Sequence, residues 1–399
     1  MCNGFLSTTM MVALTAAAVS TPILASITRS PAQAPATAYS VPSLRTPWDE
    51  PDLQGIWTVE ANTPLQRPAT YATQEFFTEA QRIELDSART GLPGKDRRAA
   101  RGTEIDVTGS YNQVFLSRKR TGARTSLIVD PHDGRLPPLT PEAQKMAAAE
   151  REYRLALMQA TETCKIKYPT CNGGKYDPTP SPRRAEPPPR YNTGRMNRHD
   201  GPEDGALSDR CLTAGLPEFG NITGSFRQIV QTIGGISIFY DVGQGQGRQR
   251  NIVMDGSPHL AANIRQWYGD SRGHWEGNTL VIDVTNFSPK TDYLGSRENL
   301  HLIERWTRTG PTSLEYVVTI EDPTVWTQPW TVTQGFTKQS DQDNRLYYEP
   351  RCIEGNYGHP GLLRGARMEE LAFAQGRGPD PATKDSATAI DGFEDDPLR

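Results

Sequence analysis

Asp270–Phe287, DSRGHWEGNTLVIDVTNF, is the stretch that decides the fold class. A turn, WEGN, separates a polar segment from an extended one, as in a β-hairpin. In the second segment, Leu280, Ile282 and Val284 alternate with polar or smaller residues, so they share one face of a strand. The opposite face is mixed and carries Asp283, which fits either a solvated outer surface or a polar lumen. The stretch therefore predicts a β-protein with one purely apolar sheet face.

The pattern repeats through the C-terminal half. From about residue 220 the chain contains about seven short strand-like runs with turn residues between them: SFRQIVQT, ISIFYDV, RQRNIVM, NTLVIDVTNF, NLHLIERWTR, TSLEYVVTIED and PWTVTQGFTK. Consecutive strands with short connections favour an antiparallel meander. We expect a mainly β fold with a few helices (α+β), in which the meander closes as a barrel; a β-sandwich is the alternative.

The N-terminus predicts export. Met10–Val19 is an apolar run followed by small residues, as in a secretory signal peptide, although no Lys or Arg precedes it. The alternative is an apolar, disordered tail. The run is too short to span a membrane, and no later segment approaches that length. We therefore expect a periplasmic or secreted protein without a membrane span.

Composition and local patterns predict how the chain is divided into segments. Gly 35 and Pro 32 indicate many ordered turns and few long helices. Capping residues followed by apolar residues at helical spacing predict two helices, and a Pro/Arg-rich stretch predicts an irregular segment. The predicted organisation is a signal peptide (1–34), a disordered linker (35–47), one β-rich domain (48–370) with helices near 73–90 and 140–160 and an irregular segment at 161–200, and a disordered tail (371–399).

Charge and cysteines narrow the class of protein. The 43 basic and 47 acidic residues are well mixed, which argues against nucleic acid as a partner and leaves a small molecule. Apart from Cys2, four cysteines remain, and an even number in an exported chain predicts disulfides. We expect a local Cys164–Cys171 pair and a long-range Cys211–Cys352 pair. A zinc site is the competing interpretation, but the spacing does not suit it.

Ionisable residues concentrate around the opening stretch. His259 and His274 flank the loop RQWYGDSRG, and His301 follows a second loop. Imidazole is the side chain best suited to proton transfer near neutral pH. The histidines lack metal-ligand spacing, so we predict no metal, and no nucleophile motif or cofactor motif is present. The predicted catalytic residues are His259, Asp270, Arg272, His301 and Glu304, and the predicted ligand-binding residues are Trp267, His274, Asp283 and Arg305.

Several motifs together resemble a family. The chain resembles a large family of uncharacterised exported bacterial proteins in seven motifs that occur in order: PDLQGIWT, RTSLIVDPHDGRLPPLT, GPEDGALSDRCL, NIRQWYGDSRGHWEGNTLVIDVTNF, ENLHLIERWTR, EDPTVWTQPW and CIEGNYG. The resemblance runs from about Trp48 to Glu370 and implies export. Where members often have His after the late cysteine, this chain has Ile353. The Gly-x-Trp start before a β-meander is also similar to lipocalin-like barrels.

These observations suggest two functions. The first is a cofactor-independent acid/base enzyme, a lyase rather than a hydrolase, that cleaves a small aromatic or sugar-derived compound, with Arg272 binding an anionic oxygen. The second is a non-catalytic periplasmic binding protein for a lipophilic or aromatic ligand. Charge pairing across a solvated sheet face is the structural alternative for each single residue. His301, Arg305 and Asp283 facing a closed pocket together would favour the enzyme, whereas their facing solvent would favour a role in packing.

Overall fold

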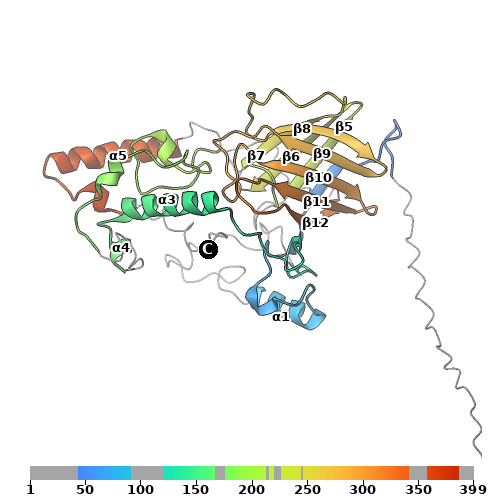
Figure 1. Cartoon of the computed structure of the whole chain (residues 1–399), viewed down its shortest axis with the longest axis horizontal. Coiled ribbons are helices and arrows are strands. Elements are labelled where there is room, and N and C mark those ends of the chain that lie inside the picture. The colour runs from blue at the N-terminus through green and yellow to red at the C-terminus, as the bar shows by residue number, and fades with distance from the viewer. Residues whose placement is uncertain are drawn as a thin grey trace, which may run out of the picture. The chain divides into compact units, whose positions relative to one another are not determined.

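Successive strands of the C-terminal half pair edge to edge until the sheet closes on itself (Figure 1). The order is β1-β5-β6-β7-β8-β9-β10-β11-β12, and β1 also pairs with β12, so nine strands form a closed barrel. β4 extends the sheet beyond β12, and β2 and β3 form a separate ribbon. The computed structural model describes residues 44–90, 120–166, 176–212, 215–219, 226–243, 246–340 and 357–385.

The strands are β1 (Gly55–Thr58), β2 (Ala61–Asn62), β3 (Arg120–Thr121), β4 (Ile128–Asp130), β5 (Phe226–Thr232), β6 (Gly235–Gly243), β7 (Gln246–Val253), β8 (Asp270–Glu276), β9 (Thr279–Thr285), β10 (His301–Arg308), β11 (Ser313–Glu321) and β12 (Trp330–Lys338). The helices are α1 (Glu79–Thr90), α3 (Pro141–Met158), α4 (Glu162–Ile166) and α5 (Gly358–Ala374), with short 3-10 turns η1 (Ala69–Tyr71), η4 (Pro182–Ala185), η5 (Pro202–Asp204) and η6 (Pro381–Thr383).

The barrel confirms the predicted fold class, with one change of strand direction. β7 and β8 run parallel and pair only at Val253 and Arg272, whereas the other barrel pairs are antiparallel. The expectation of antiparallel pairing throughout is therefore wrong at this point. A tight hairpin reverses the chain, but the longer connection 254–269 returns it to the same end of the sheet before β8 begins. The closed pairing also rules out the sandwich.

The apolar strand faces fill the barrel. Leu280, Ile282 and Val284 are fully buried in the main core, as their alternation predicts, while Asp283 lies on the outer face. Trp57, from the Gly-x-Trp segment, is also fully buried, and its indole N–H donates to the Leu53 carbonyl at 2.8 Å. Strand β1 thus closes the sheet and contributes to its interior.

Of the four described helices, α1 and α3 lie close to where the sequence predicts helices, whereas α4 lies within the segment predicted to be irregular. Thr140 caps α3, since its hydroxyl accepts a hydrogen bond from the Ala143 amide at 3.2 Å. The expected disordered tail from residue 371 is wrong over its first part, because α5 continues to Ala374 and η6 follows. The Thr163 hydroxyl donates to the Asp385 carboxylate at 2.6 Å, which fixes the chain there. Among the described residues, no helix combines the length and apolar character needed to cross a membrane.

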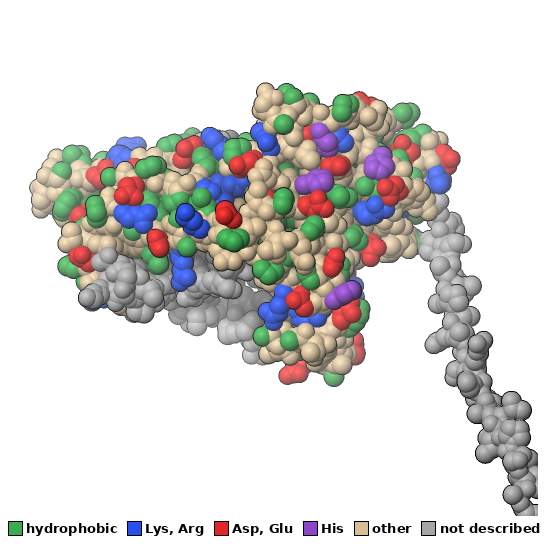
Figure 2. Space-filling view, in the orientation of Figure 1, with side chains coloured by type: hydrophobic (Ala, Val, Ile, Leu, Met, Phe, Trp, Pro, Cys, Tyr) green, Lys and Arg blue, Asp and Glu red, His purple; other side chains and the backbone are tan. Residues whose placement is uncertain are grey.

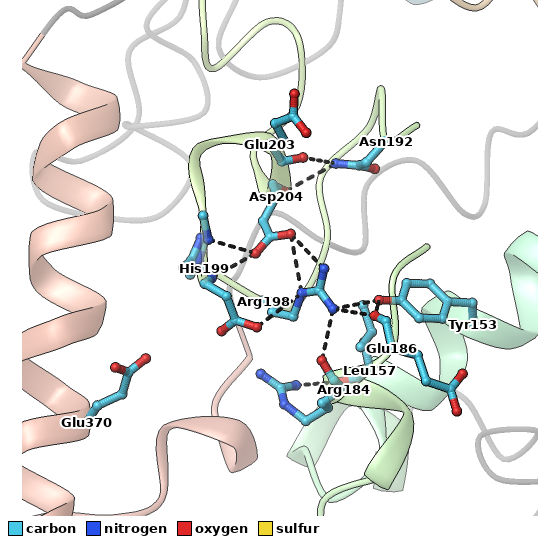
Figure 3. Close-up of polar contacts among 12 residues, drawn as sticks. Tyr153, Leu157, Arg184, Glu186, Asn192, Arg198, His199, Glu203, Asp204 and Glu370 are labelled. Carbon is cyan, nitrogen blue, oxygen red and sulfur yellow. Dashed lines mark hydrogen bonds and ion pairs between the residues drawn. The ribbon is translucent and has the colours of Figure 1, made fainter. Parts of the chain in front are cut away.

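Arg198 holds the irregular segment after residue 176 against α3 (Figure 3). Its guanidinium donates to the Asp204 carboxylate at 2.9 Å, to the Tyr153 hydroxyl at 2.8 Å and to the Glu186 carbonyl at 2.8 Å. The other Asp204 oxygen accepts the Asp200 amide at 2.7 Å. These contacts explain how a charged side chain is buried in a segment with little regular structure.

The cysteines differ from expectation. Cys164 lies in α4, is buried and is free, so the predicted Cys164–Cys171 disulfide is wrong. The helix turns the thiol into the packing, where it acts as a small apolar side chain. Cys171 itself lies outside the described residues, as does Cys352, so the Cys211–Cys352 pair stays a prediction. Residues 1–43, which include the predicted signal peptide and most of the linker, also lie outside.

Candidate acid–base site on the outer face of the barrel

Four neighbouring strands bring carboxylates and imidazoles to one patch of the outer surface. Because side chains alternate along each strand, Asp270 on β8, Asp283 on β9, His301 on β10 and Glu321 on β11 all point away from the core. His259 reaches the patch from the connection between β7 and β8. In the space-filling view, histidine and acidic side chains gather over the barrel strands (Figure 2).

Asp270 anchors the first half of the patch. Its carboxylate accepts from His259 Nδ1 at 2.9 Å and from the Leu260 amide at 3.0 Å. Arg272 binds both Asp270 oxygens, through Nε and Nη2, each at 3.0 Å. Burial raises the pKa of Asp270, but the hydrogen bonds from Arg272, Leu260 and His259 outweigh it, and the pKa falls below its usual value. Asp270 therefore stays ionised and fixes the orientation of the His259 ring.

Asp283 joins two imidazoles. Its Oδ1 lies 3.2 Å from His259 Nε2 and 3.0 Å from His301 Nε2. The far nitrogen of His301, Nδ1, lies 3.1 Å from the Glu321 carboxylate. We call this series the His–carboxylate chain. In order of contact, it consists of Asp270, His259, Asp283, His301 and Glu321.

The chain alternates groups that donate and accept protons. A neutral imidazole carries one N–H and one lone pair, so it can donate to only one of its two carboxylate neighbours at a time. A doubly protonated ring makes both bonds. Side-chain exposures of 28% for His259, 31% for His301 and 45% for Asp283 leave the middle of the chain open to small molecules. The arrangement can therefore supply a proton and accept one at adjacent atoms.

Arg272 makes three hydrogen bonds to protein groups, and its predicted role of binding a substrate oxygen stays a prediction. Arg272 binds Asp270 through Nε and Nη2, and its Nη1 donates to the Ser257 hydroxyl at 2.6 Å. These bonds use three of its five N–H groups and orient the Asp270 carboxylate. Ser257 is a site residue that the sequence did not indicate.

Glu304 is separated from the site by the barrel wall. It is fully buried on the inner face of β10 and binds Arg250 at 2.6 Å and the Tyr316 hydroxyl at 2.8 Å. Burial lowers the pKa of Arg250, but the charge of Glu304 more than offsets this, so the pKa is raised. Burial, reinforced by Glu304, raises the pKa of the Tyr316 hydroxyl. Assigning Glu304 to the same catalytic group as His301 is wrong, because residues separated by an odd number of positions face opposite sides of a strand.

The remaining predicted residues lie beside the chain rather than in it. Arg305 binds Glu276 at 2.6 Å, and His274 lies 3.2 Å from the same carboxylate, all on the exposed outer face. Trp267 is half-buried in the connection that carries His259. Arg305, His301 and Asp283 face outward and do not line a closed pocket, and this exposure favours charge pairing on a solvated face for each of them.

Glu321 is the chain member that sequence reasoning missed. Its strand alternation places it on the outer face, but only the register, which pairs His301 with Glu321, brings the two side chains together. Among the described residues, no group of three or more His, Cys, Asp or Glu side chains has the geometry to hold a metal ion.

Fold and site together define a closed β-barrel protein with a His–carboxylate chain on its outer face. No family model matches the sequence, and the search of curated proteins found no match. Among solved structures, the chain is similar to the crystal structure of a mutant of the fluorescent protein UnaG, with 12% identity, a TM-score of 0.19, and coverage of 29% of this chain and 72% of that one. A similarity at this level does not bear on function.

Proposed function

We propose that this protein is an acid–base enzyme whose site is the middle of the His–carboxylate chain. The observation that carries the proposal is the meeting of His259 and His301 on a single oxygen of Asp283, with a second carboxylate behind each ring. This resembles a base oriented by a carboxylate, the usual design for side chains that move protons.

The roles follow from the contacts. Both imidazoles contact Asp283 through Oδ1, and among the described residues no contact to Oδ2 is found, so this half-exposed oxygen can take a proton from a bound molecule. An imidazolium of His259 or His301 can give a proton to the group that leaves. Proton removal at one atom and proton donation at another is the requirement of an elimination, so a lyase-type reaction remains our preferred class. Asp270 and Glu321 hold the two rings at the orientation that Asp283 needs.

The substrate class is a small aromatic or sugar-derived molecule, bound at the surface and not inside the barrel, because the core side chains fill the interior around Glu304. We propose that the enzyme acts after export, on the strength of the apolar run at Met10–Val19. Mass spectrometry of the protein from the periplasm of its host would test this, because export predicts loss of the N-terminal segment.

A search for the substrate tests the enzymatic proposal. Purified protein is incubated with the small molecules extracted from a strain that lacks it, and mass spectrometry records which compounds disappear. We expect the wild type to consume a compound that the double variant His259→Ala/His301→Ala leaves intact. The matched control is Glu315→Gln, an exposed carboxylate on the outer face of the same strand as Glu321. Equal consumption by the double variant and the wild type would refute the proposal.

A further inference from the structure

Asn286, the residue directly after β9, has a backbone conformation that few side chains adopt. Its φ is 58°, in the left-handed region that asparagine tolerates better than most residues. The residue is 9% exposed, and its side-chain amide has two hydrogens to donate. Nδ2 donates to the Leu260 carbonyl at 2.9 Å and to the Ala261 carbonyl at 3.2 Å. The amide therefore binds the carbonyls of the two residues that follow His259 in the connection 254–269.

Main-chain contacts fix the other end of this connection. The Gln266 amide donates to the Asn286 carbonyl at 2.9 Å, and the Ser288 amide donates to the Gln266 carbonyl at 2.8 Å. At Gly269 the connection approaches β9 so closely that a Cβ atom would lie 2.6 Å from the Thr285 carbonyl oxygen. None of these contacts uses the Asn286 side chain, so the far end of the connection keeps them without it.

The end of the connection that carries His259 is held between two side chains. The Leu260 amide donates to the Asp270 carboxylate at 3.0 Å, and the Leu260 carbonyl accepts from Asn286. The same Asp270 oxygen lies 2.9 Å from His259 Nδ1, so it is a fixed point about which the ring and its backbone can turn. Such a turn would carry His259 Nε2 away from Asp283 Oδ1, which now lies at 3.2 Å. The Asn286 amide opposes this turn, because it holds the carbonyls of the next two residues.

We propose that Asn286 is a positioning residue of the His–carboxylate chain, and that its side-chain amide keeps His259 Nε2 against Asp283. The inference rests on the proposed function, because it identifies what holds one of the two rings at the oxygen on which that function depends. His301 does not depend on this amide, since it lies on β10 and meets Asp283 across neighbouring strands at 3.0 Å. Loss of the amide therefore releases one ring and leaves the other in contact, a difference that a general loss of structure would not produce.

The test is NMR spectroscopy of the histidine rings in the whole protein at one fixed pH, with signals assigned through His259→Gln and His301→Gln. It measures how each ring responds to Asp283→Asn. In the otherwise wild-type protein, we expect this change to shift the ring signals of both His259 and His301, because each ring loses a charged partner. Asn286→Gly keeps access to the left-handed backbone conformation and removes the amide. In that background, Asp283→Asn should still shift the His301 signals and should leave the His259 signals unchanged.

Two further variants keep the outcome decisive. Asn263→Gly is the matched control, because Asn263 is an exposed asparagine of the same connection, and both rings should respond in it as they do in the wild type. If Asn286→Gly does not fold, Asn286→Asp takes its place with the same expectation, since aspartate has nearly the same shape and no amide donor.

The proposal would be overturned by a His259 response of wild-type size in the Asn286 variant, or by loss of the response in both rings. Failure of both Asn286 variants to fold would also overturn it, because the residue would then support the barrel, and so would a wild type in which His259 does not respond to Asp283→Asn. No substrate is involved, so these results are distinct from turnover by Asp283→Asn, which tests the proposed function.

Discussion

Asp283 is the residue on which the site depends. Its Oδ1 lies within 3.2 Å of one imidazole and 3.0 Å of another, yet the side chain is 45% exposed. Ion pairs that are this exposed to solvent contribute only about 0–1 kcal/mol to the free energy of unfolding. A chain of such pairs therefore adds little stability to the barrel.

Asp283→Asn should separate stability from function. We expect the free energy of unfolding, measured by urea denaturation, to fall by no more than about 1 kcal/mol, because water already screens the contacts that are lost. A loss of more than about 2 kcal/mol would mean that the residue is part of the structural support and would weaken the functional interpretation.

Asp270→Asn should behave differently, because Asp270 is buried and holds Arg272 with two hydrogen bonds. We expect a loss of about 1–3 kcal/mol at pH 7, the usual cost of disrupting buried bonds to a charged group. The folded-state pKa of Asp270 is lowered. The stability it contributes is thus present above its unfolded pKa of about 4 and is lost as the pH falls through the lower folded value. Urea unfolding at several pH values should show the difference between variant and wild type shrinking below about pH 4. A difference that does not vary with pH would contradict this account.

At the scale of the strand, the sequence predicts which face of the sheet a side chain occupies better than it predicts the register between strands. The alternation in NTLVIDVTNF correctly places Leu280, Ile282 and Val284 inside and Asp283 outside. The pairing of His301 with Glu321 could not be predicted, since it depends on how β10 aligns with β11. His259 lies in the connection between β7 and β8, and these two strands pair in parallel. No local sequence pattern indicates this pairing. The free Cys164 shows the same limit: cysteine spacing alone does not determine which side chains meet.

Strand β10 carries His301 on its outer face and the buried Glu304 on its inner face. The variant Glu304→Gln tests whether Glu304 is a structural residue. Removing one partner of the buried Arg250–Glu304 pair leaves an uncompensated charge in the core, so we expect a loss of about 3–5 kcal/mol in urea unfolding. The double variant Arg250→Met/Glu304→Leu should be less destabilised than Glu304→Gln, because no charge is left unpaired. If Glu304→Gln proves as stable as the wild type, Glu304 is not the structural residue described above.

At the scale of the whole described domain, a half-buried ion pair joins α3 to the barrel. Arg190 binds both oxygens of Glu150 on α3, at 2.8 Å and 2.9 Å, and donates to the Gly295 carbonyl between β9 and β10 at 2.9 Å. Burial raises the pKa of Glu150, but the hydrogen bond and charge of Arg190 more than offset it, so the net shift is downward. The loop that Arg190 binds lies directly before His301. The ion pair therefore connects α3 to the loop that positions His301.

Arg190→Ala should loosen this junction without unfolding the barrel. Hydrogen exchange measured by mass spectrometry should show faster exchange in the segment around residue 190 and in 286–300, because the ion pair no longer restrains them. The central barrel strands should keep their protection. Uniformly faster exchange across all strands would show that the ion pair supports the whole fold instead.

The most direct test of the central claim is the turnover rate of two matched variants on the substrate found by the metabolite search. Glu321→Gln breaks the end of the His–carboxylate chain, whereas Glu315→Gln makes the same change on the outer face of β11 away from it. We predict that kcat/KM falls about 10-fold or more for Glu321→Gln and about 100-fold or more for Asp283→Asn, in line with the contribution of acid–base groups, and is unchanged for Glu315→Gln. Full turnover by Asp283→Asn would contradict the account.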